Sequence, residues 1–263
     1  MFNIFFQFCT IFSAGYLLLC AGLLIFQRKL IYFPQERAMV SESNTQSLPI
    51  QEGKLILTVR ARSGPNAVIY FGGNGEDVSI NLPDLAQAFP DQAIYLMHYR
   101  GFGGSSGSAN EAALHADALS LYQYAQAQHS NITIIGRSLG TGIAIRLASQ
   151  RPTTRLILVT PYDSLQELAI EQFPYVPVRW LLQDKFESWR YASAVTAPTT
   201  ILRAELDEVI PAASTLKLLA RFQQGIANRT VITPASHNSI LTSRTYIPAL
   251  PSSTMHAKSD STQ

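Results

Sequence analysis

Residues 132–148 read ITIIGRSLGTGIAIRLA, and this stretch decides the fold. It begins with a short β-branched run, Ile132–Ile135, which is typical of a buried strand, and it ends in an apolar run with helical spacing. A Gly-x-Ser-x-Gly motif, Gly136 to Gly140, joins the two. Such a motif presents a serine hydroxyl for attack only where it forms a tight turn between a strand and a helix. The sequence therefore predicts that Ser138 is a nucleophile. The alternative is a small residue that merely fits the turn.

The same motif occurs a second time, at Gly103–Gly107, with Ser105 at its centre. No strand-like run directly precedes it, and its high glycine content favours a flexible loop. A helical pattern begins only later, after Asn110, which stands in a capping position. Ser105 is therefore the weaker of the two candidate nucleophiles.

Short apolar runs and longer amphipathic runs alternate along most of the chain. This alternation predicts βαβ units, hence an α/β fold with a mostly parallel central sheet flanked by helices. Ligands of such sheets lie at the carboxyl ends of the strands, so candidate residues are sought immediately after each strand. The predicted strands are Leu55–Val59, Ala67–Phe71, Ala93–Met97, Ile132–Ile135, Leu156–Val159, Thr200–Leu202 and Thr230–Thr233; the predicted helices are Ser79–Phe89, Glu111–Gln128, Leu139–Gln150 and Ser214–Phe222.

A serine hydroxyl needs an adjacent base to become an effective nucleophile. His237 lies directly after the last predicted strand, in the sequence Pro-Ala-Ser-His-Asn, and is the predicted base. Its alternative is a solvated loop histidine. The other four histidines end a strand, belong to or border a polar helix, or lie in the polar tail: His98, His115, His129 and His256.

The acid that orients the base should follow the preceding strand. Asp207, in Asp-Glu-Val-Ile-Pro, lies beyond that strand and ahead of a helix, and it is the predicted third member of the triad. Along the chain the three predicted triad residues come in the order Ser138, Asp207, His237. This is one of three chain orders described for such triads. Other acids remain open as alternatives, as does an ordinary turn or capping role for Asp207: Asp163, Glu205 and Glu208.

Backbone N–H groups should stabilise the oxyanion that develops during acyl transfer. One is expected from Leu139, the residue after the nucleophile, and the second from the loop after an early strand. Gly72-Gly73-Asn74-Gly75 is that loop, and we expect the Asn74 N–H to be the donor, with Gly73 as the alternative. The loop has neither a Gly-x-Gly-x-x-Gly fingerprint nor a Walker lysine, which argues against nucleotide binding.

The N-terminal segment Ile4–Phe26 carries no charged residue, and Arg28 and Lys29 follow it. As a helix it would extend about 34 Å, enough to cross a hydrocarbon core of about 30 Å. The segment is predicted to be a single transmembrane anchor; a cleaved signal peptide and a buried helix are the alternatives. Because the positive charges follow the span, the positive-inside rule places the main domain in the cytoplasm.

Composition excludes several classes of protein. The 263 residues are 47% hydrophobic and 14% charged, with a net charge of +2, which does not fit a disordered chain or a nucleic-acid-binding surface. Cys9 and Cys20 both lie in the N-terminal apolar segment. Two such cysteines build no disulfide framework, and no cysteine pair suited to a metal site remains. Neither a metal nor an organic cofactor is expected.

With these motifs the chain resembles the α/β-hydrolase superfamily from about residue 54 to residue 249. More narrowly, it resembles the membrane-anchored branch of ABHD13-, ABHD17- and Bem46-type proteins and their bacterial relatives. The resemblance implies an anchor at 1–29, a juxtamembrane lead-in at 30–53, a hydrolase domain at 54–251 and a polar tail at 252–263. The segments that carry it are the N-terminal span, LIYFP at 30–34, YFGGNG at 70–75, YRGFG at 99–103, the Ser138 turn, DEVIP at 207–211 and SHN at 236–238.

The chain departs from that branch in two places. Its relatives usually have His where Gly72 stands, and the helix after the base looks short because Pro248 and Pro251 interrupt it. A small helical cap is expected at about 162–191, where several aromatic residues gather. Those aromatic residues are expected to pack the cap onto the body; the alternative is an acyl-binding pocket.

Together these features predict a membrane-anchored serine hydrolase that cleaves ester or thioester bonds through an acyl-enzyme. The expected substrates are small-molecule or lipid acyl esters, and no nucleic-acid partner is expected. A peptidase or amidase of the same fold, a catalytically silent scaffold, and acyl transfer to an alcohol are alternatives. The oligomeric state stays open.

Overall fold

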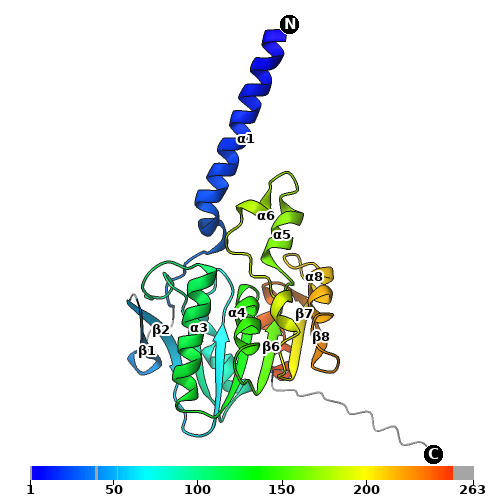
Figure 1. The fold of residues 1–263 in the computed structure, drawn as a ribbon. Coiled ribbons are helices and arrows are strands. Elements are labelled where there is room, and N and C mark those ends of the chain that lie inside the picture. Colours follow the sequence, from blue (N-terminus) through cyan, green and yellow to red (C-terminus); the bar gives the residue numbers. More distant parts are fainter. Residues whose placement is uncertain (1, 39–40, 52, 251–263) are drawn as a thin grey trace, which may run out of the picture.

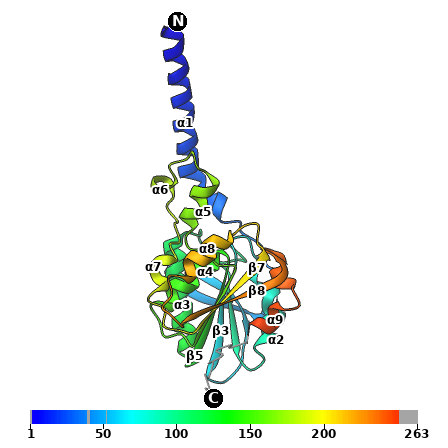
Figure 2. The same cartoon turned by 90° about the vertical axis from the view of Figure 1, so that its right-hand side faces the viewer.

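The computed structural model describes residues 2–38, 41–51 and 53–250. A central eight-stranded sheet carries helices on both faces, and one long helix, α1 (Phe2–Ile31), projects from the body (Figures 1 and 2). This arrangement confirms the predicted α/β fold with a mostly parallel sheet. The predicted tail at 252–263 and His256 lie outside the described residues.

The strand order in the sheet is β1-β2-β4-β3-β5-β6-β7-β8. Strand β2 pairs antiparallel with β1 and with β4, whereas β4, β3, β5, β6, β7 and β8 run parallel. The carboxyl ends of the parallel strands therefore meet at one edge, where a site is expected. The strands are β1 (Thr45–Ile50), β2 (Gly53–Arg60), β3 (Asn66–Phe71), β4 (Ala93–Met97), β5 (Asn131–Arg137), β6 (Arg155–Val159), β7 (Thr199–Leu206) and β8 (Ala227–Ser236).

Strand β1 lies inside the segment that the sequence predicts to be a polar lead-in. It pairs with β2 from Thr45 to Ile50 at the edge of the sheet, and Leu48 alone in it is buried. An edge strand with one solvated face needs few apolar residues, which explains why its polar sequence resembles a linker. The hydrolase-fold sheet therefore begins at residue 45, before the predicted boundary at 54.

Alternation along the strands builds two cores, one on each face of the sheet. Helices α3 (Glu111–Gln126), α4 (Leu139–Ala148), α7 (Trp189–Ala192) and α8 (Ala212–Leu219) cover one face, and α2 (Leu82–Ala88) and α9 (Tyr246–Ala249) cover the other (Figure 2). Strand β3 sends Ala67, Ile69 and Phe71 into the first core and Val68 and Tyr70 into the second.

Two elements stand above the carboxyl edge. Helix α1 contains a candidate membrane span of 28 residues, Ile4–Ile31, that is long and apolar enough to cross a membrane, and the helix runs two residues beyond the predicted anchor. The small helical cap that the sequence predicts lies between β6 and β7 and contains three short helices, α5 (Leu165–Gln172), α6 (Val178–Leu181) and α7. The final helices η3 (Ser239–Thr242) and α9 are short, as the prolines suggested.

Candidate active site

Ser138 occupies the sharp turn between β5 and α4, with φ of 47°. This left-handed backbone is costly for a residue with a side chain, so the surrounding structure must impose it. The turn fits only because its neighbours are glycines: a Cβ on Gly140 would lie 2.1 Å from the Phe71 carbonyl oxygen, and one on Gly136 would lie 2.5 Å from the Gly140 oxygen. The strand, tight turn and helix that the sequence predicts around Ser138 are all present.

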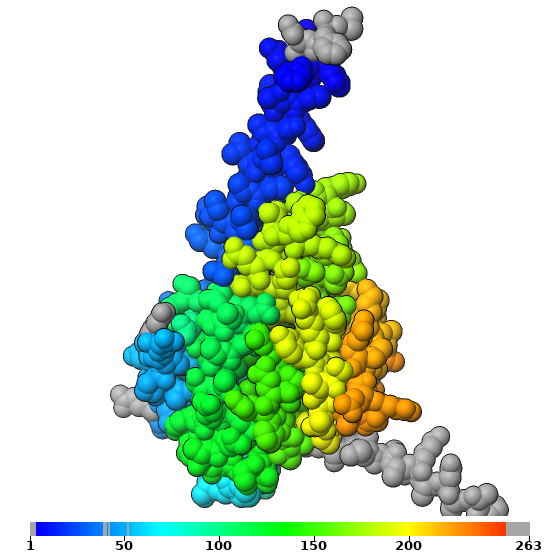
Figure 3. Space-filling model, in the orientation of Figure 1, coloured from blue at the N-terminus to red at the C-terminus, as the bar shows by residue number. Residues whose placement is uncertain are grey.

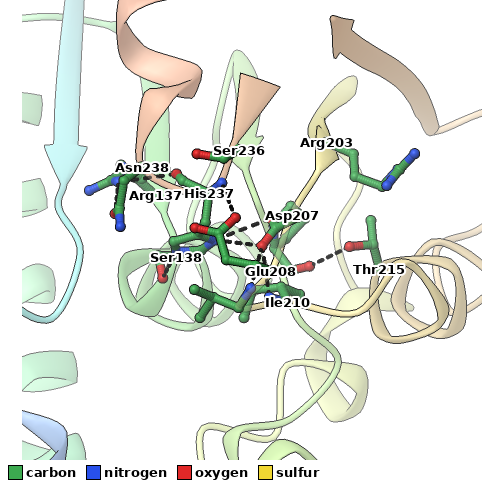
Figure 4. A network of polar contacts seen from close by, with 12 residues as sticks. Arg137, Ser138, Arg203, Asp207, Glu208, Ile210, Thr215, Ser236, His237 and Asn238 are labelled. Carbon is green, nitrogen blue, oxygen red and sulfur yellow. Dashed lines mark hydrogen bonds and ion pairs between the residues drawn. The ribbon is translucent and has the colours of Figure 1, made fainter. Parts of the chain in front are cut away.

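The structure brings the three predicted triad residues together, although they lie on three separate loops (Figure 4). His237, after β8, places its Nε2 3.0 Å from Ser138 Oγ. The other ring nitrogen, Nδ1, lies 3.0 and 3.1 Å from the two carboxylate oxygens of Asp207, after β7. One hydrogen-bonded chain therefore runs from hydroxyl to imidazole to carboxylate.

Besides the His237 imidazole, two backbone N–H groups bind the Asp207 carboxylate. It accepts hydrogen bonds from the backbone N–H groups of Val209 at 3.0 Å and Ile210 at 2.8 Å, in the turn that leads into α8. Its side chain is 1% exposed. Because its charge is satisfied by N–H donors and shielded from water, the carboxylate can fix the orientation of the imidazole.

The alternative acids lie elsewhere. Asp163 accepts a hydrogen bond from Ser214 Oγ at 2.6 Å. Glu208 is close to the base but accepts from the His237 backbone N–H at 3.1 Å, not from the ring. Glu205 is exposed near the end of β7. Among the candidate acids, only Asp207 has a hydrogen bond to the imidazole in the part of the chain that the structure describes.

The second Gly-x-Ser-x-Gly motif is a closed structural loop. Ser105 Oγ donates to the His98 carbonyl oxygen at 2.8 Å and accepts from the Ile56 N–H at 2.8 Å. Backbone hydrogen bonds from Gly101 to Ser105 and from Ser105 to Phe102 hold the loop, so it is more tightly tied than its glycine content suggests.

The remaining described histidines have local partners. His98 Nε2 lies 2.8 Å from Thr58 Oγ1, His115 lies 3.6 Å from Glu111, and His129 Nε2 lies 3.0 Å from Tyr95 Oη.

The loop after β3 lies beside Ser138. A Cβ on Gly73 would stand 3.8 Å from Ser138 Cβ. The Gly73 N–H already donates to Glu76 Oε2 at 2.6 Å, so it is occupied. Among the described residues, the N–H groups of Asn74 and Leu139 have no protein acceptor, and both residues line the pocket in front of Ser138. These two donors are therefore the ones available to an oxyanion.

Position 72 explains one departure from the resembled branch. A Cβ on Gly72 would stand 2.5 Å from Val78 Cγ1 and 3.2 Å from the Glu76 carboxyl carbon. The Gly72 carbonyl oxygen accepts a hydrogen bond from Tyr99 Oη at 2.7 Å. The Glu76 carboxyl group and Val78 thus fill the space that a side chain at 72 would need.

A buried ion pair links the three loops of the site. Arg137 Nη1 lies 2.7 Å from Glu76 Oε2. Arg137 Nη2 donates to the His237 carbonyl oxygen at 3.3 Å and to Asn238 Oδ1 at 3.2 Å (Figure 4). Burial alone would lower the pKa of the Arg137 guanidinium, but the adjacent Glu76 carboxylate raises it above its usual value. The guanidinium therefore stays charged, and its contacts connect the Gly73 loop, the Ser138 turn and the His237 loop.

Sequence reasoning missed this pair. Glu76 also accepts hydrogen bonds from Tyr70 Oη at 2.6 Å and Asn81 Nδ2 at 2.5 Å. The sequence did contain a signal. Glu76 and Arg137 each adjoin a glycine at or just beyond the end of a buried apolar strand, where a charged side chain is expected to need a partner. Nothing in the sequence, however, pairs position 76 with position 137.

A pocket of about 750 Å³ opens in front of Ser138 and His237. Its lining is largely apolar. Besides the loops that carry Ser138, His237 and Asn74, it includes the cap, the loop after β7 and the carboxyl-terminal end of α1. The contribution from α1 was not expected, because a membrane anchor need not touch the active site. The lining side chains from α1 are Leu23, Gln27, Leu30 and Ile31.

Comparisons with known proteins agree with this architecture. Residues 66–186 match the family model described as alpha/beta hydrolase fold. An uncharacterized protein of Mycobacterium tuberculosis, Rv2307c, is 31% identical over 245 residues, covering 84% of this chain and 85% of that protein.

Two relatives carry descriptive names. The lysophosphatidylserine lipase ABHD12 of Danio rerio is 29% identical over 174 residues, covering 57% of this chain and 45% of that protein. Protein bem46 of Schizosaccharomyces pombe is 25% identical over 187 residues, covering 65% of this chain and 60% of that protein. Among solved structures, Est1E from Butyrivibrio proteoclasticus superposes with a TM-score of 0.63 at 14% identity, covering 78% of this chain and 96% of that one. The chain thus has a hydrolase fold and relatives that include a lipase.

Proposed function

The chain belongs to the α/β-hydrolase family, and on that premise we propose that it is a membrane-anchored serine hydrolase that cleaves carboxylic ester or thioester bonds. Ser138 is the nucleophile, His237 the general base and acid, and Asp207 the residue that orients the imidazole. The observation that carries the proposal is the hydrogen-bonded chain through these three side chains, with Ser138 lining an open pocket.

The reaction begins when the Ser138 oxygen attacks the substrate carbonyl carbon and His237 Nε2 takes the hydroxyl proton. The negative charge that develops on the carbonyl oxygen is stabilised by the N–H groups of Leu139 and Asn74. His237 then gives the proton to the leaving alcohol or thiol, and an acyl-enzyme remains. Water, deprotonated by the same imidazole, attacks the acyl carbonyl. The imidazolium then returns that proton to the Ser138 oxygen as its bond to the acyl group breaks, which releases the carboxylic acid and free Ser138.

The lining of the pocket supports an acyl substrate. Burial of an acyl chain there is worth about 0.8 kcal/mol per methylene group, so long chains should bind better than short ones. Leu165, Leu168 and Val176 from the cap line the pocket together with the residues of α1. The name of the ABHD12 relative points to a lysophospholipid, which has one acyl chain and a polar head group, as the first candidate substrate.

Helix α1 supports the membrane assignment. Its apolar stretch is long enough to span a bilayer, and 6% of its most apolar window is buried against the rest of the protein. In this proposal the hydrolase domain faces the cytoplasm, an orientation favoured by Arg28 and Lys29 at the end of α1 under the positive-inside rule. In this proposal residues 1–29 form the anchor, 30–53 lead into the sheet and include β1, and 54–251 form the rest of the hydrolase domain.

A series of p-nitrophenyl esters from acetyl to palmitoyl tests the proposal, with matched thioesters and anilides. We expect kcat/KM to rise with chain length, to be comparable for ester and thioester, and to be lower for the anilide. Ser138→Ala should abolish all of these activities. Faster anilide cleavage would favour a peptidase or amidase instead.

Two further results would redirect the assignment. A folded wild-type protein that hydrolyses none of these compounds would favour a non-catalytic scaffold. Products in which an added alcohol, rather than water, receives the acyl group would identify a transferase.

A further inference from the structure

The tip of the cap, Phe173–Leu182, reads FPYVPVRWLL and presents large apolar side chains to the outside. Tyr175 is 89% exposed, Trp180 is 87% exposed and Phe173 is 49% exposed. Single exposed apolar residues are ordinary on a soluble protein, but three large aromatic residues on one short tip indicate a contact surface. Arg179 is the one charged residue of the tip, and its Nη2 lies 3.7 Å from Glu167 Oε1 of α5.

The cap tip is held against α1 at several heights. Tyr16 Oη donates to the Tyr175 carbonyl oxygen at 2.9 Å, far along the helix from the body. Nearer the body, Gln27 Nε2 donates to the Leu181 carbonyl oxygen at 3.1 Å and Gln27 Oε1 accepts from the Gln183 N–H at 2.7 Å. Figures 1 and 3 show the cap standing beside α1 above the sheet.

Arg28 at the end of α1 and Tyr32 just after it also bind the cap, through Asp184. Asp184 has a 5% exposed side chain, and its Oδ2 accepts from Arg28 Nε at 3.2 Å and from Tyr32 Oη at 3.0 Å. The interaction with Asp184 and burial both raise the pKa of Tyr32, with burial the larger cause, so its hydroxyl stays protonated as a donor. The cap and α1 therefore form one joined structure.

The position of Tyr16 sets the depth of the tip. A helix needs about 20 residues to cross the hydrocarbon core. Every stretch of that length that fits within the apolar run Ile4–Ile31 contains Tyr16. If α1 spans the membrane, Tyr175, which is bonded to Tyr16, must lie at the depth of the hydrocarbon or its boundary.

The backbone of the tip is suited to such a position, because a bilayer offers no water to satisfy polar groups. Pro174 and Pro177 remove two N–H donors, and the Tyr16 hydroxyl satisfies the Tyr175 carbonyl oxygen. Most of the remaining N–H groups donate to carbonyl oxygens within or next to the tip; the donors are Phe173, Val176, Val178, Trp180, Leu181 and Leu182.

The active-site pocket reaches this joined structure. Its lining includes Ser138 and His237 together with Leu23 of α1 and with Phe173 and Val176 of the cap tip. The pocket that holds Ser138 is therefore lined in part by apolar side chains of α1 and the cap tip, which an acyl chain beside α1 would contact.

We propose that the cap tip Phe173–Leu182 inserts into the same membrane that α1 crosses, and that substrate passes from the bilayer into the pocket that the tip and α1 line together. The inference rests on the membrane anchoring proposed above. The partner of this surface is a lipid bilayer, and the exposed aromatic side chains are the groups that contact it.

Tryptophan fluorescence in the full-length protein tests the depth of the tip, because the chain has only two tryptophans, Trp180 and Trp189. Trp189→Phe leaves Trp180 as the single reporter on the tip, and Trp180→Phe leaves Trp189 on α7 as the matched control. Both proteins are reconstituted into phosphatidylcholine vesicles whose acyl chains carry bromine, a contact quencher. We expect Trp180 to lose most of its emission and Trp189 to keep most of its own.

Two readouts on the same vesicles separate this inference from the proposed function. Flotation with the vesicles reports anchoring by α1, and turnover of a water-soluble acetyl ester reports the triad. A protein that floats and hydrolyses the ester, yet shows no greater quenching of Trp180 than of Trp189, would overturn membrane insertion of the tip alone. A protein that does not float would overturn the anchor, and the tip inference with it.

A charge on the tip gives a functional test. Trp180 does not line the pocket, so Trp180→Glu should leave hydrolysis of a soluble acetyl ester unchanged. It should lower hydrolysis of a long-chain ester in vesicles by about tenfold or more, because a carboxylate at hydrocarbon depth is costly. Val231→Glu, at an exposed apolar residue on β8, is the matched control and should affect neither substrate. Equal activity of Trp180→Glu and wild type on the vesicle substrate would contradict the proposal.

Discussion

The chain contains two Gly-x-Ser-x-Gly motifs, and its structure uses them in opposite ways. Ser138 and Ser105 are buried to a similar extent, with 9% and 7% of their surfaces exposed. Their hydroxyl groups differ in their partners. Ser105 Oγ bonds two backbone groups, the His98 carbonyl and the Ile56 N–H, whereas Ser138 Oγ bonds the imidazole of His237. Burial does not distinguish them; the chemical nature of the partner does.

The surrounding backbone explains this difference. The strand before Ser138 and the helix after it force a left-handed turn that places the hydroxyl in front of the pocket. The glycines around Ser105 instead let the chain fold back on β2. The Ser105 hydroxyl oxygen then accepts a hydrogen bond from the Ile56 N–H, as a backbone carbonyl would in a paired strand. A serine whose donor and acceptor are both satisfied by backbone stabilises a loop, and one that faces a base can react.

The largest effects should come from the partners of Ser138. We expect Asp207→Asn to lower kcat for an activated ester by about 10⁴-fold, because the imidazole loses the carboxylate that fixes its tautomer. His237→Ala should lower it by a similar factor or more. Steady-state kinetics on a soluble ester measures both.

Asp163→Asn is the control for these variants, since Asp163 is a buried aspartate bonded to Ser214 and not to the base. Its kcat should stay within a few-fold of wild type. If Asp163→Asn proved as damaging as Asp207→Asn, the assignment of Asp207 would be wrong.

The Arg137–Glu76 pair should be next in effect. Glu76→Gln leaves a buried guanidinium without its counter-charge, which we expect to cost about 3–5 kcal/mol of unfolding free energy. It also weakens the hold on the Gly73 loop and the His237 loop, so kcat should fall by about 10- to 100-fold with little change in KM. Denaturant unfolding and ester kinetics measure the two effects.

The double variant Glu76→Gln with Arg137→Met separates positioning from stability. Replacing both charges removes the unpaired ion, so the unfolding free energy should recover substantially. The kcat should remain low, because the link between the loops is lost. Recovery of kcat together with stability would show that the pair contributes stability alone.

Ser105→Ala tests the other side of the comparison. The Ile56 N–H and the His98 carbonyl oxygen lose their partner in a buried region, so we expect a loss of about 2–3 kcal/mol in unfolding free energy. Activity at a temperature where the variant is folded should match wild type. Urea titrations followed by circular dichroism measure the stability. A stable Ser105→Ala without activity would be evidence against a purely structural role.

The smallest effect concerns His98, which supports the Ser105 loop. Burial lowers its pKa from 6.5 to about 4, partly offset by Asp77. Because the unfolded state binds the proton more readily, this stabilisation is complete above pH 6.5 and is lost as pH falls toward 4. Between pH 7.5 and pH 5 we expect a loss on the order of 1 to 2 kcal/mol from this group.

His98→Gln should flatten that dependence. The quantity to compare is the change in unfolding free energy from pH 7.5 to pH 5 in the variant and in wild type. Comparing the two proteins cancels the contributions of other titrating groups to this change. His115 is one such group, since burial lowers its pKa as well. An equal pH dependence in both proteins would show that His98 does not titrate as described.

Local signals in the sequence were sufficient for the turn at Ser138 and for the strands around it. The glycines at 136 and 140 and the apolar run before them specify this geometry within a few residues. The positions of Asp207 and His237 also followed, because each lies directly after a parallel strand and such ends meet at one edge.

Long-range pairings could not be predicted in this way. Arg137 and Glu76 lie 61 residues apart, and only the tertiary fold brings them together. Strand β1 has one buried residue, too few for a clear alternation. Helix α1 is apolar on all sides, so its sequence does not reveal that one side of its end lines the pocket.

The most direct test of the central claim is labelling with a fluorophosphonate probe, which reacts covalently only with an activated serine. Detergent-solubilised wild type, Ser138→Ala and Ser105→Ala are compared, with thermal unfolding of each recorded to show that it is folded. We expect wild type and Ser105→Ala to label and Ser138→Ala to remain unlabelled. Labelling that survives Ser138→Ala, or that disappears in a folded Ser105→Ala, would contradict the assignment of Ser138 as the nucleophile.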